Sequence, residues 1–143
     1  TFINTKNLVS VEFLSLSHNQ LTAVPDFLEC KKLINLNLSY NRLCGGFDQL
    51  TKLKSVKVLD LAYNGLDFPL AHFYQQIVIP LKQLPNLQYI SFAGNPIETS
   101  IPDFKCFVIN ELPKLIFFNW DAVTKEDRAK ASAVALKGTW KAK

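Results

Sequence analysis

The sequence predicts an α/β solenoid, with a curved parallel β-sheet on the concave face and short helices or 3₁₀ turns on the convex face. The first observation is a repeated segment in which apolar residues keep one spacing and an asparagine follows them. The four asparagines are Asn19, Asn41, Asn64 and Asn95, at intervals of 22, 23 and 31 residues. Such intervals indicate a repeat protein, in which each unit buries its apolar side against its neighbours. The second observation is that no linker or low-complexity stretch interrupts the 143 residues, which indicates one domain.

The repeated segment has the order apolar, two variable, apolar, one variable, apolar, two variable, Asn, one variable, apolar. Its copies are Val11-Leu14-Leu16-Asn19-Leu21, Leu33-Leu36-Leu38-Asn41-Leu43, Val56-Leu59-Leu61-Asn64-Leu66 and Leu87-Ile90-Phe92-Asn95-Ile97. Alternate residues of a strand face opposite sides, so the middle apolar pair points to the core and each copy predicts one strand. A degenerate fifth copy, with valine at the asparagine position, reads Leu115-Phe118-Trp120-Val123.

The asparagines come where each strand turns away from the sheet. An asparagine side chain offers two N–H donors and one carbonyl acceptor, and buried backbone groups need hydrogen-bond partners. The sequence therefore predicts a structural ladder in which Asn19, Asn41, Asn64 and Asn95 bond the backbone of adjacent turns.

The first two return segments are short. Residues 24–28 include Pro25 and are too few for a full helix, so they predict a 3₁₀ turn or an extended crossing. In the next repeat, the Gly45-Gly46 pair permits a tight turn. Apolar residues then recur at every third position from Phe47 to Leu53.

The two longer return segments predict helices. Residues 72–79 predict one helix, which Pro80 ends or kinks. Apolar residues at helical spacing predict a second helix over residues 104–112, with Asp103 as its N-cap and Pro113 as its stop.

A final helix is predicted to cover the last strand. Thr124 and Asp127 have a relation close to a capping box, the alanine-rich residues 128–136 favour helix, and Gly138 is predicted to end it. Trp140 either docks back on the convex surface or lies in a frayed tail. The side of this helix expected to be buried consists of Ala129, Ala133 and Leu136.

By these repeats the chain is identified as a member of the leucine-rich repeat family, of the intracellular type with SDS-like repeats. Its C-terminal part resembles the capping motif shared by the spliceosomal leucine-rich subunit, the acidic nuclear phosphoproteins and the leucine-rich dynein light chain. The resemblance implies an intracellular solenoid. Those relatives commonly have a leucine-aspartate pair where Phe118-Asn119 stands here. The run that carries the resemblance is Gly94-Asn95-Pro96-Ile97, Phe104, Phe107-Val108-Ile109, Leu112-Pro113-Lys114-Leu115 and Val123-Thr124-Lys125-Glu126-Asp127-Arg128.

The predicted domain covers residues 1–143. Residues 1–10 are expected to be the remnant of a preceding repeat or cap, residues 11–114 four full repeats, and residues 115–143 the degenerate last repeat with the capping helix. The chain begins at Thr1 and contains no methionine, so we expect a fragment of a larger protein.

The three cysteines predict reduced thiols, because they are odd in number and stand in different repeats. They are Cys30, Cys44 and Cys106. Together with the resemblance they indicate an intracellular location, in the cytoplasm or alternatively the nucleus. The longest apolar runs are too short for a membrane span.

No cofactor, metal site or catalytic activity is predicted. No pair of cysteines has the Cys-x-x-Cys spacing of a zinc site. The residue types of a catalytic triad occur on the predicted strands, but no Gly-x-Ser-x-Gly elbow is present and a sheet face offers no water-excluding pocket. The triad candidates are Ser15, Ser17, His18, Ser39 and Asp60. The sequence thus indicates a non-enzymatic protein.

The net charge of +4 is a property of the C-terminal tail. Residues 1–123 hold ten basic and ten acidic side chains, whereas residues 124–143 hold six basic and two acidic ones. Such a tail contacts phosphates in some proteins, although a charged helix end is more often a solvated face. The lysines concerned are Lys125, Lys130, Lys137, Lys141 and Lys143.

The outward strand positions carry the predicted function, because packing does not consume these side chains. They combine aromatic rings with small polar groups, and rings on a rigid sheet suit binding. Small neighbours are expected to leave room for a partner side chain between the rings. The alternative is that the rings stack on each other and only cover the sheet. The predicted binding residues are Phe13, His18, Tyr40, Arg42, Asp60, Tyr63, Tyr89, Phe117 and Asn119.

We therefore predict a protein-protein interaction module that binds a partner protein or peptide on its concave face, as a scaffold or regulatory domain of a larger intracellular protein. The alternative is a ribonucleoprotein or chromatin-associated component, in which the basic tail also contacts nucleic acid. The sequence indicates neither the identity of the partner nor an oligomeric state.

Overall fold

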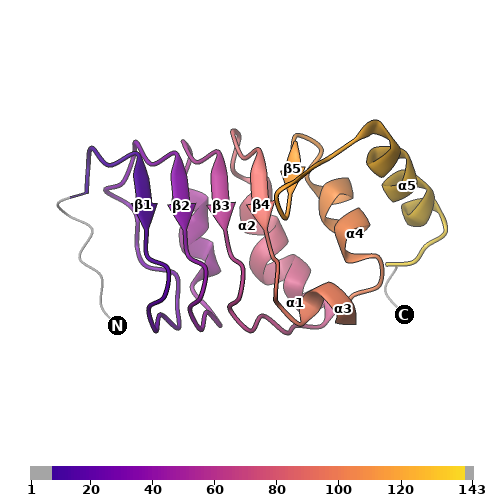
Figure 1. Ribbon diagram of the computed structural model, residues 1–143, viewed down its shortest axis with the longest axis horizontal. Coiled ribbons are helices and arrows are strands. Elements are labelled where there is room, and N and C mark those ends of the chain that lie inside the picture. The colour runs from indigo at the N-terminus through magenta and orange to yellow at the C-terminus, as the bar shows by residue number, and fades with distance from the viewer. Residues whose placement is uncertain (1–7, 141–143) are drawn as a thin grey trace.

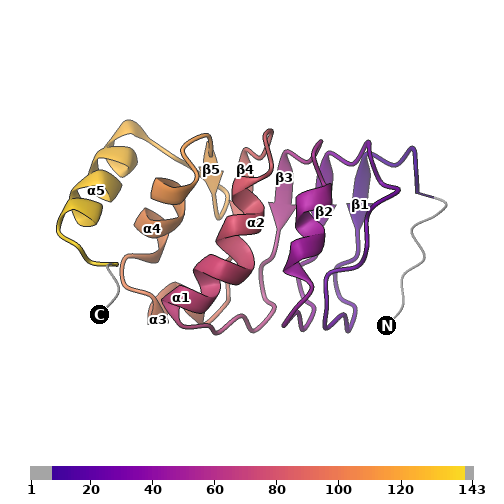
Figure 2. The same ribbon diagram turned by 180° about the vertical axis from the view of Figure 1, so that it is seen from behind.

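Residues 8–140 are described by a computed structural model, in which six short strands form one sheet. Strands β1 to β5 pair in parallel in chain order, and β6 pairs antiparallel with β5. The strands line one face of an elongated molecule, with helices behind them (Figure 1, Figure 2). The strands are β1 (Phe13–Ser15), β2 (Asn35–Asn37), β3 (Val58–Asp60), β4 (Tyr89–Ser91), β5 (Phe117–Phe118) and β6 (Asp121–Ala122). The predicted α/β solenoid is thereby confirmed; its concave face is the sheet face turned away from the helices.

The inward residues of the strands form a row through the core. Leu14 pairs with Leu36, which pairs with Leu59, and the row continues through Ile90 and Phe118. Four phenylalanines, Phe27, Phe47, Phe73 and Phe92, fill the space behind the sheet and are fully buried. Burying each large apolar side chain contributes about 1.5–3 kcal/mol, so the repeats are held together by one continuous core.

The convex face carries a different element in each repeat. The first return segment has no helix and crosses in extended form, with a bridge between Ala23 and Gly45. The helical elements are η1 (a 3₁₀ helix, Phe47–Lys52), α1 (Leu70–Phe73), η2 (a π-helix, Tyr74–Val78), α2 (Ile79–Lys82), α3 (Ile97–Ser100), α4 (Phe104–Glu111) and α5 (Lys125–Leu136). None of the helices within residues 8–140 is long and apolar enough to cross a membrane.

The helix predicted over residues 72–79 does not end at Pro80. The helical run α1-η2-α2 is continuous from Leu70 to Lys82, and its middle is a π-helix. In that stretch the N–H of Ile79 donates to the oxygen of Tyr74, five residues earlier. A proline has no N–H and its ring clashes with the carbonyl four residues before it; here that carbonyl belongs to Gln76 in the π-helix, and the helix continues past Pro80.

The fourth return segment has two helices where one was predicted. Helix α4 begins after Asp103 and ends before Pro113, as predicted, although the Asp103 side chain makes no capping hydrogen bond. The short α3 before it was not predicted, because its four residues carry no helical period.

Trp120 lies on the surface, with 58% of its area exposed, so its predicted place in the inward pattern is wrong. Asn119 and Trp120 are both left-handed, with φ of 49° and 70°. Two such residues form the tight turn of a β-hairpin, and the chain returns antiparallel as β6 instead of continuing the repeat.

The final helix α5 packs on α4, and its predicted capping box is present between Thr124 and Asp127. Its buried residues are Ala131 and Val134, so the prediction of Ala129, Ala133 and Leu136 is wrong; Leu136 is 87% exposed. The inward face is selected by Arg128, one helical turn before Ala131.

Arg128 and Trp140 both join the C-terminal helix α5 and the residues after it to α4 and its flanking residues. The guanidinium of Arg128 donates to the carbonyl oxygens of Ile109, Leu112 and Leu115. Beyond α5, Gly138 has φ 75° and ends the helix, as predicted. Trp140 then docks: its indole N–H donates to the oxygen of Pro102 at 2.8 Å, and its ring lies 5.2 Å from that of Phe107.

Candidate protein-binding face

Three rings stack beyond the ends of β1, β2 and β3. The centroids of His18 and Tyr40 are 4.3 Å apart at an interplanar angle of 12°, and those of Tyr40 and Tyr63 are 4.6 Å apart at 9°. All three residues are left-handed, with φ of 58°, 57° and 54°, a conformation that few residues other than glycine adopt. The shared backbone conformation aims the rings in one direction. We call His18, Tyr40 and Tyr63 the aromatic ladder.

The fourth repeat has Gly94 in place of a ring, and Tyr63 covers it. A β-carbon on Gly94 would lie 2.3 Å from Cε1 of Tyr63 and 2.4 Å from Cδ1. Gly94 is also left-handed, with φ 71°. The ladder therefore ends with the Tyr63 ring lying against the backbone of Gly94. Any side chain at position 94 would collide with that ring.

A second stack lies on β4 and β5. The rings of Tyr89 and Phe117 have centroids 4.4 Å apart at an angle of 21°. Phe13, at the same position of β1, is 69% exposed and separated from this stack by Asn35 and Val58. For a side chain to fit between two rings, the rings must be about 7 Å apart, which is twice an atomic contact distance. The expected room between neighbouring rings is therefore absent in both stacks, and the ring edges are what the face presents.

A row of polar side chains lies between these two aromatic positions along the strands. It consists of Ser15, Asn37, Asp60 and Ser91, and we call it the polar row. Each of its members accepts a hydrogen bond from the backbone N–H two residues later, at 3.4, 2.9, 2.9 and 3.3 Å respectively. These bonds satisfy the first amides of each turn after the strand.

Asp60 is the charged member of the polar row. It is half-buried, and its Oδ1 accepts from the N–H of Ala62. Burial raises the pKa of the Asp60 carboxyl above its ordinary value, and the Ala62 N–H partly opposes that shift.

Asn119 closes the row with a different contact. Its Oδ1 accepts from the N–H of Phe92 at 2.8 Å, and its Nδ2 donates to Oε1 of Glu98 at 2.5 Å. The other oxygen of Glu98 accepts from the N–H of Gly94 at 3.1 Å. Asparagine, unlike the aspartate of the resembling cap, donates to a carboxylate here. Glu98 was missed by sequence reasoning, because it lies outside the strand pattern.

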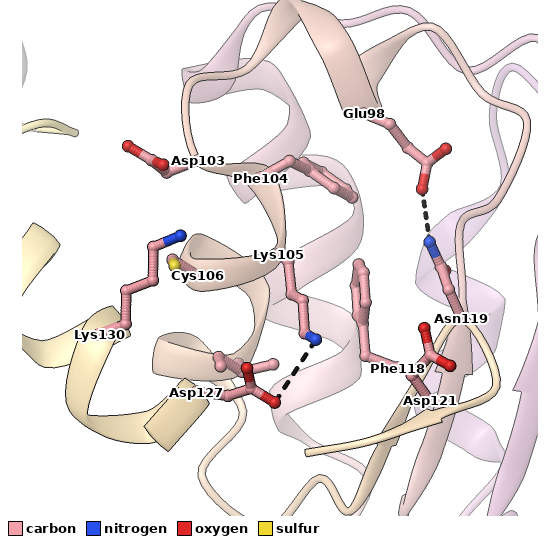
Figure 3. A pocket seen from close by; sticks show the side chains of 11 residues that line it. Glu98, Asp103, Phe104, Lys105, Cys106, Phe118, Asn119, Asp121, Asp127 and Lys130 are labelled. Atoms are coloured by element: carbon pink, nitrogen blue, oxygen red, sulfur yellow. Dashed lines mark hydrogen bonds and ion pairs between the residues drawn. The ribbon is translucent and has the colours of Figure 1, made fainter. Parts of the chain in front are cut away.

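A hollow of about 460 Å³ opens beside this contact, between β5-β6 and the helices α4 and α5 (Figure 3). Charged side chains dominate its wall, and Lys105 pairs with Asp127 across it at 3.4 Å. Its lining residues include Glu98, Asp103, Lys105, Asp121, Asp127 and Lys130.

Arg42 lies beside the aromatic ladder. It is exposed and lines a shallow groove with Gln20 and the rings of His18, Tyr40 and Tyr63. The groove therefore brings one cation and amide groups to the edges of the rings.

Asparagines join the repeats beneath the ladder. The carbonyl of Asn41 accepts from the N–H of Leu21 at 3.1 Å, and its amide donates to oxygens of Leu16, Leu38 and Ser39. Asn64 and Asn95 make the equivalent contacts one and two repeats further on. Within residues 8–140, Asn19, at the exposed first repeat, donates to the oxygens of Leu16 and Ser17 of its own repeat.

The serine and histidine side chains of the concave face do not assemble into a triad. Ser39 is buried, Ser15 and Ser17 bond to each other at 3.0 Å, and His18 stacks on Tyr40. No hydrogen bond joins the His18 ring to a serine within residues 8–140.

The three thiols are free. Burial raises the pKa of Cys30 and of Cys106, so both are protonated and poor nucleophiles or metal ligands. Over the described part of the chain, no group of three His, Cys, Asp or Glu residues is placed to hold a metal ion.

The model of the Leucine Rich Repeat family matches residues 10–30 and 86–107. The chain belongs to the leucine-rich repeat family. As a leucine-rich repeat domain it has the fold of a chain in the crystal structure of the Drosophila melanogaster SNF/U2A′ complex, with a TM-score of 0.70 and 22% identity over 89% of this chain and 70% of that one. A leucine-rich repeat protein of Leptospira interrogans matches with a TM-score of 0.53 and 28% identity, over 79% of this domain and 32% of that chain.

Two curated relatives are much longer than this domain. A probable inactive serine/threonine-protein kinase of Dictyostelium discoideum is 46% identical over 94% of the leucine-rich repeat domain, which spans 7% of that protein. Human dynein axonemal assembly factor 1 is 33% identical over 57% of the domain and is covered over 10% of its length.

Proposed function

We propose that this leucine-rich repeat domain is a non-enzymatic interaction module that binds a partner protein or peptide on its concave face. One observation carries the proposal: the ladder tyrosines are prearranged and yet open. Tyr40 and Tyr63 are 45% and 49% exposed, and their hydroxyl groups make no hydrogen bond within residues 8–140.

Stacking prepares these rings for contact. A ring held between two neighbours has little rotamer freedom left to lose when a partner binds, and this loss is a main cost of association. Each stacked pair stabilises the free domain by about 0.5–1.5 kcal/mol. The ring edges and hydroxyl groups then offer both apolar area and hydrogen bonds, which is why tyrosine is common among binding hot spots.

The backbone supports the same proposal. Three aromatic residues adopt the left-handed conformation in consecutive repeats, at a cost of about 1–2 kcal/mol each. Strained conformations of this kind cluster at functional sites. Gly94 adopts the same conformation in the fourth repeat, where glycine avoids this cost; the first three repeats carry rings in spite of it.

The context we propose is a scaffold or regulatory domain of a larger intracellular protein, in the cytoplasm or the nucleus. Three free cysteines and relatives named as axonemal assembly factors and an inactive kinase support this context. A chain of similar fold belongs to the SNF/U2A′ complex, which supports protein binding as the role.

The test is affinity capture from cell lysate with the wild-type chain and a Tyr40→Ala/Tyr63→Ala variant. We expect the variant to lose a protein that wild type retains at both low and high salt. Leu136→Ala is the control, because Leu136 is 87% exposed and lies on α5, away from the strands. The variant Tyr40→Phe/Tyr63→Phe keeps the stacked rings and removes their hydroxyl groups. It therefore distinguishes the contribution of the hydroxyl groups to binding from that of the rings.

Circular dichroism must show that each variant is folded. A captured set that is the same for wild type and the alanine variant would overturn the proposal. Capture of nucleic acid that salt releases would instead support the basic tail, of which Lys125, Lys130 and Lys137 lie in or beside α5 while Lys141 and Lys143 lie outside the described residues.

A further inference from the structure

We propose that Asp60 receives a basic side chain, lysine or arginine, of the protein bound on the concave face. This inference rests on the proposed function and adds the chemistry of the partner at one position. Asp60 ends the central strand β3, between Asn37 of β2 and Ser91 of β4.

Along the chain, Asp60 lies between an aromatic residue and an aliphatic one. Tyr63 of the aromatic ladder follows it by three residues, and Val58 precedes it by two in the row that leads to Tyr89 and Phe117. Such surroundings exclude water once a partner covers them. An ion pair formed there is stronger than one formed in open solvent.

The charge of Asp60 is not needed for the fold. Its structural contact is the hydrogen bond from the N–H of Ala62 at 2.9 Å. The equivalent bond to Asn37 has the same length, and Ser91 accepts the corresponding one at 3.3 Å. Because neutral side chains perform this role in the adjacent repeats, the negative charge is additional to it.

Within residues 8–140, no lysine or arginine forms an ion pair with Asp60. The ion pairs within residues 8–140 join Lys52 to Asp26, Lys82 to Glu111 and Lys105 to Asp127. A carboxylate that is partly withdrawn from water without a cation is unfavourable, and the raised pKa of Asp60 reflects this cost. A basic group from outside would remove the cost.

A basic side chain fits this position better than a metal ion. Calcium and magnesium require several oxygen ligands, and no group of three candidate ligands exists over the described chain. A guanidinium or ammonium group pairs with a single carboxylate. The neighbouring Asn37 oxygen is already used by Ser39, which leaves Asp60 as the acceptor for a cation.

The experiment is an NMR titration of the ¹⁵N-labelled chain with the peptide acetyl-Gly-Arg-Gly-amide. The reporter is the backbone amide of Ala62, because it donates a hydrogen bond to Oδ1 of Asp60. We expect a saturable shift of this amide with the arginine peptide and none with acetyl-Gly-Glu-Gly-amide. In Asp60→Asn the arginine peptide should bind about fivefold more weakly, the effect of losing one ion pair.

Asp48→Asn is the matched control. It removes one negative charge from an exposed residue of η1 on the convex face, and it should leave the Ala62 shift unchanged. The Asp60→Asn spectrum must keep the Ala62 amide dispersed, since asparagine accepts the same bond at position 37.

Equal affinity of the arginine peptide for wild type and Asp60→Asn would overturn this inference. So would an equal response to the glutamate peptide. Neither result touches the proposed function, which the ladder variants test separately. Conversely, capture that is indifferent to the ladder variants would refute the proposed function even if arginine bound at Asp60.

Discussion

The ring of Tyr63 lies where a side chain of residue 94 would begin, so the aromatic ladder ends on Gly94 as a stack on bare backbone. This contact makes the glycine part of the candidate binding face, although it presents no side chain itself. It also explains why the ring series of the first three repeats does not continue into the fourth.

Gly94→Ala should displace Tyr63 and destabilise the domain. The substitution combines a left-handed backbone, which costs about 1–2 kcal/mol for alanine, with a β-carbon 2.3 Å from the ring. Gly65→Ala is the matched control, because Gly65 has φ 69° and nothing within 4 Å of its added β-carbon. Urea denaturation should show a larger loss for Gly94→Ala than for Gly65→Ala; equal losses would mean that Tyr63 moves without cost.

Asn41→Ala should lower the free energy of unfolding by about 1–3 kcal/mol, because it leaves the buried N–H of Leu21 without an acceptor. The oxygens of Leu16 and Leu38, which belong to two repeats, each lose one of their two asparagine donors. Asn19→Ala is the comparison: it is exposed and bonds within one repeat, so its loss should be smaller. A loss for Asn19→Ala as large as that for Asn41→Ala would contradict this account, with both measured by denaturation.

Much of this architecture follows from spacing alone. The interval between asparagines predicts the strands and their parallel order, because one apolar pattern repeats with one residue type at each turn. The spacing also places Tyr40 beside Tyr63. It does not show that their rings meet face to face, since this depends on a left-handed backbone at the two tyrosines, which only Gly94 at the equivalent position of the fourth repeat indicates.

The C-terminal end was harder to predict for a similar reason. The turn at Asn119 and Trp120 reverses the chain, and a tryptophan is an unusual residue for such a turn. The buried side of α5 was misjudged because alanines surround the helix on several sides. The contacts of Arg128 determine which of these sides faces the core. Its three carbonyl partners belong to a distant segment, which no local sequence pattern connects to Arg128.

Arg128→Lys should destabilise the cap by about 1–3 kcal/mol, the cost of leaving buried carbonyls without donors. A single ammonium group cannot reproduce the planar array that contacts the oxygens of Ile109, Leu112 and Leu115. Lys125→Ala, at an exposed residue of the same helix, is the control and should change little. Hydrogen exchange of the α4 amides should accelerate in Arg128→Lys, and unchanged exchange would contradict this role.

Asp60→Asn should stabilise the free domain at neutral pH. Because burial raises the pKa of Asp60 in the folded state, the folded domain holds this proton more tightly than the unfolded chain does. The carboxylate therefore costs stability as the pH rises through the folded pKa, and that cost vanishes at pH values below the unfolded pKa of about 3.9. Asparagine keeps the hydrogen bond from Ala62 without the charge, so the difference in unfolding free energy between the two proteins should be present at pH 7 and shrink on acidification.

Urea denaturation of both proteins from pH 3 to pH 7 measures this difference. If the wild type were more stable than Asp60→Asn at pH 7, the negative charge of Asp60 would stabilise the folded domain. The reason for proposing that this charge binds a partner would then be lost.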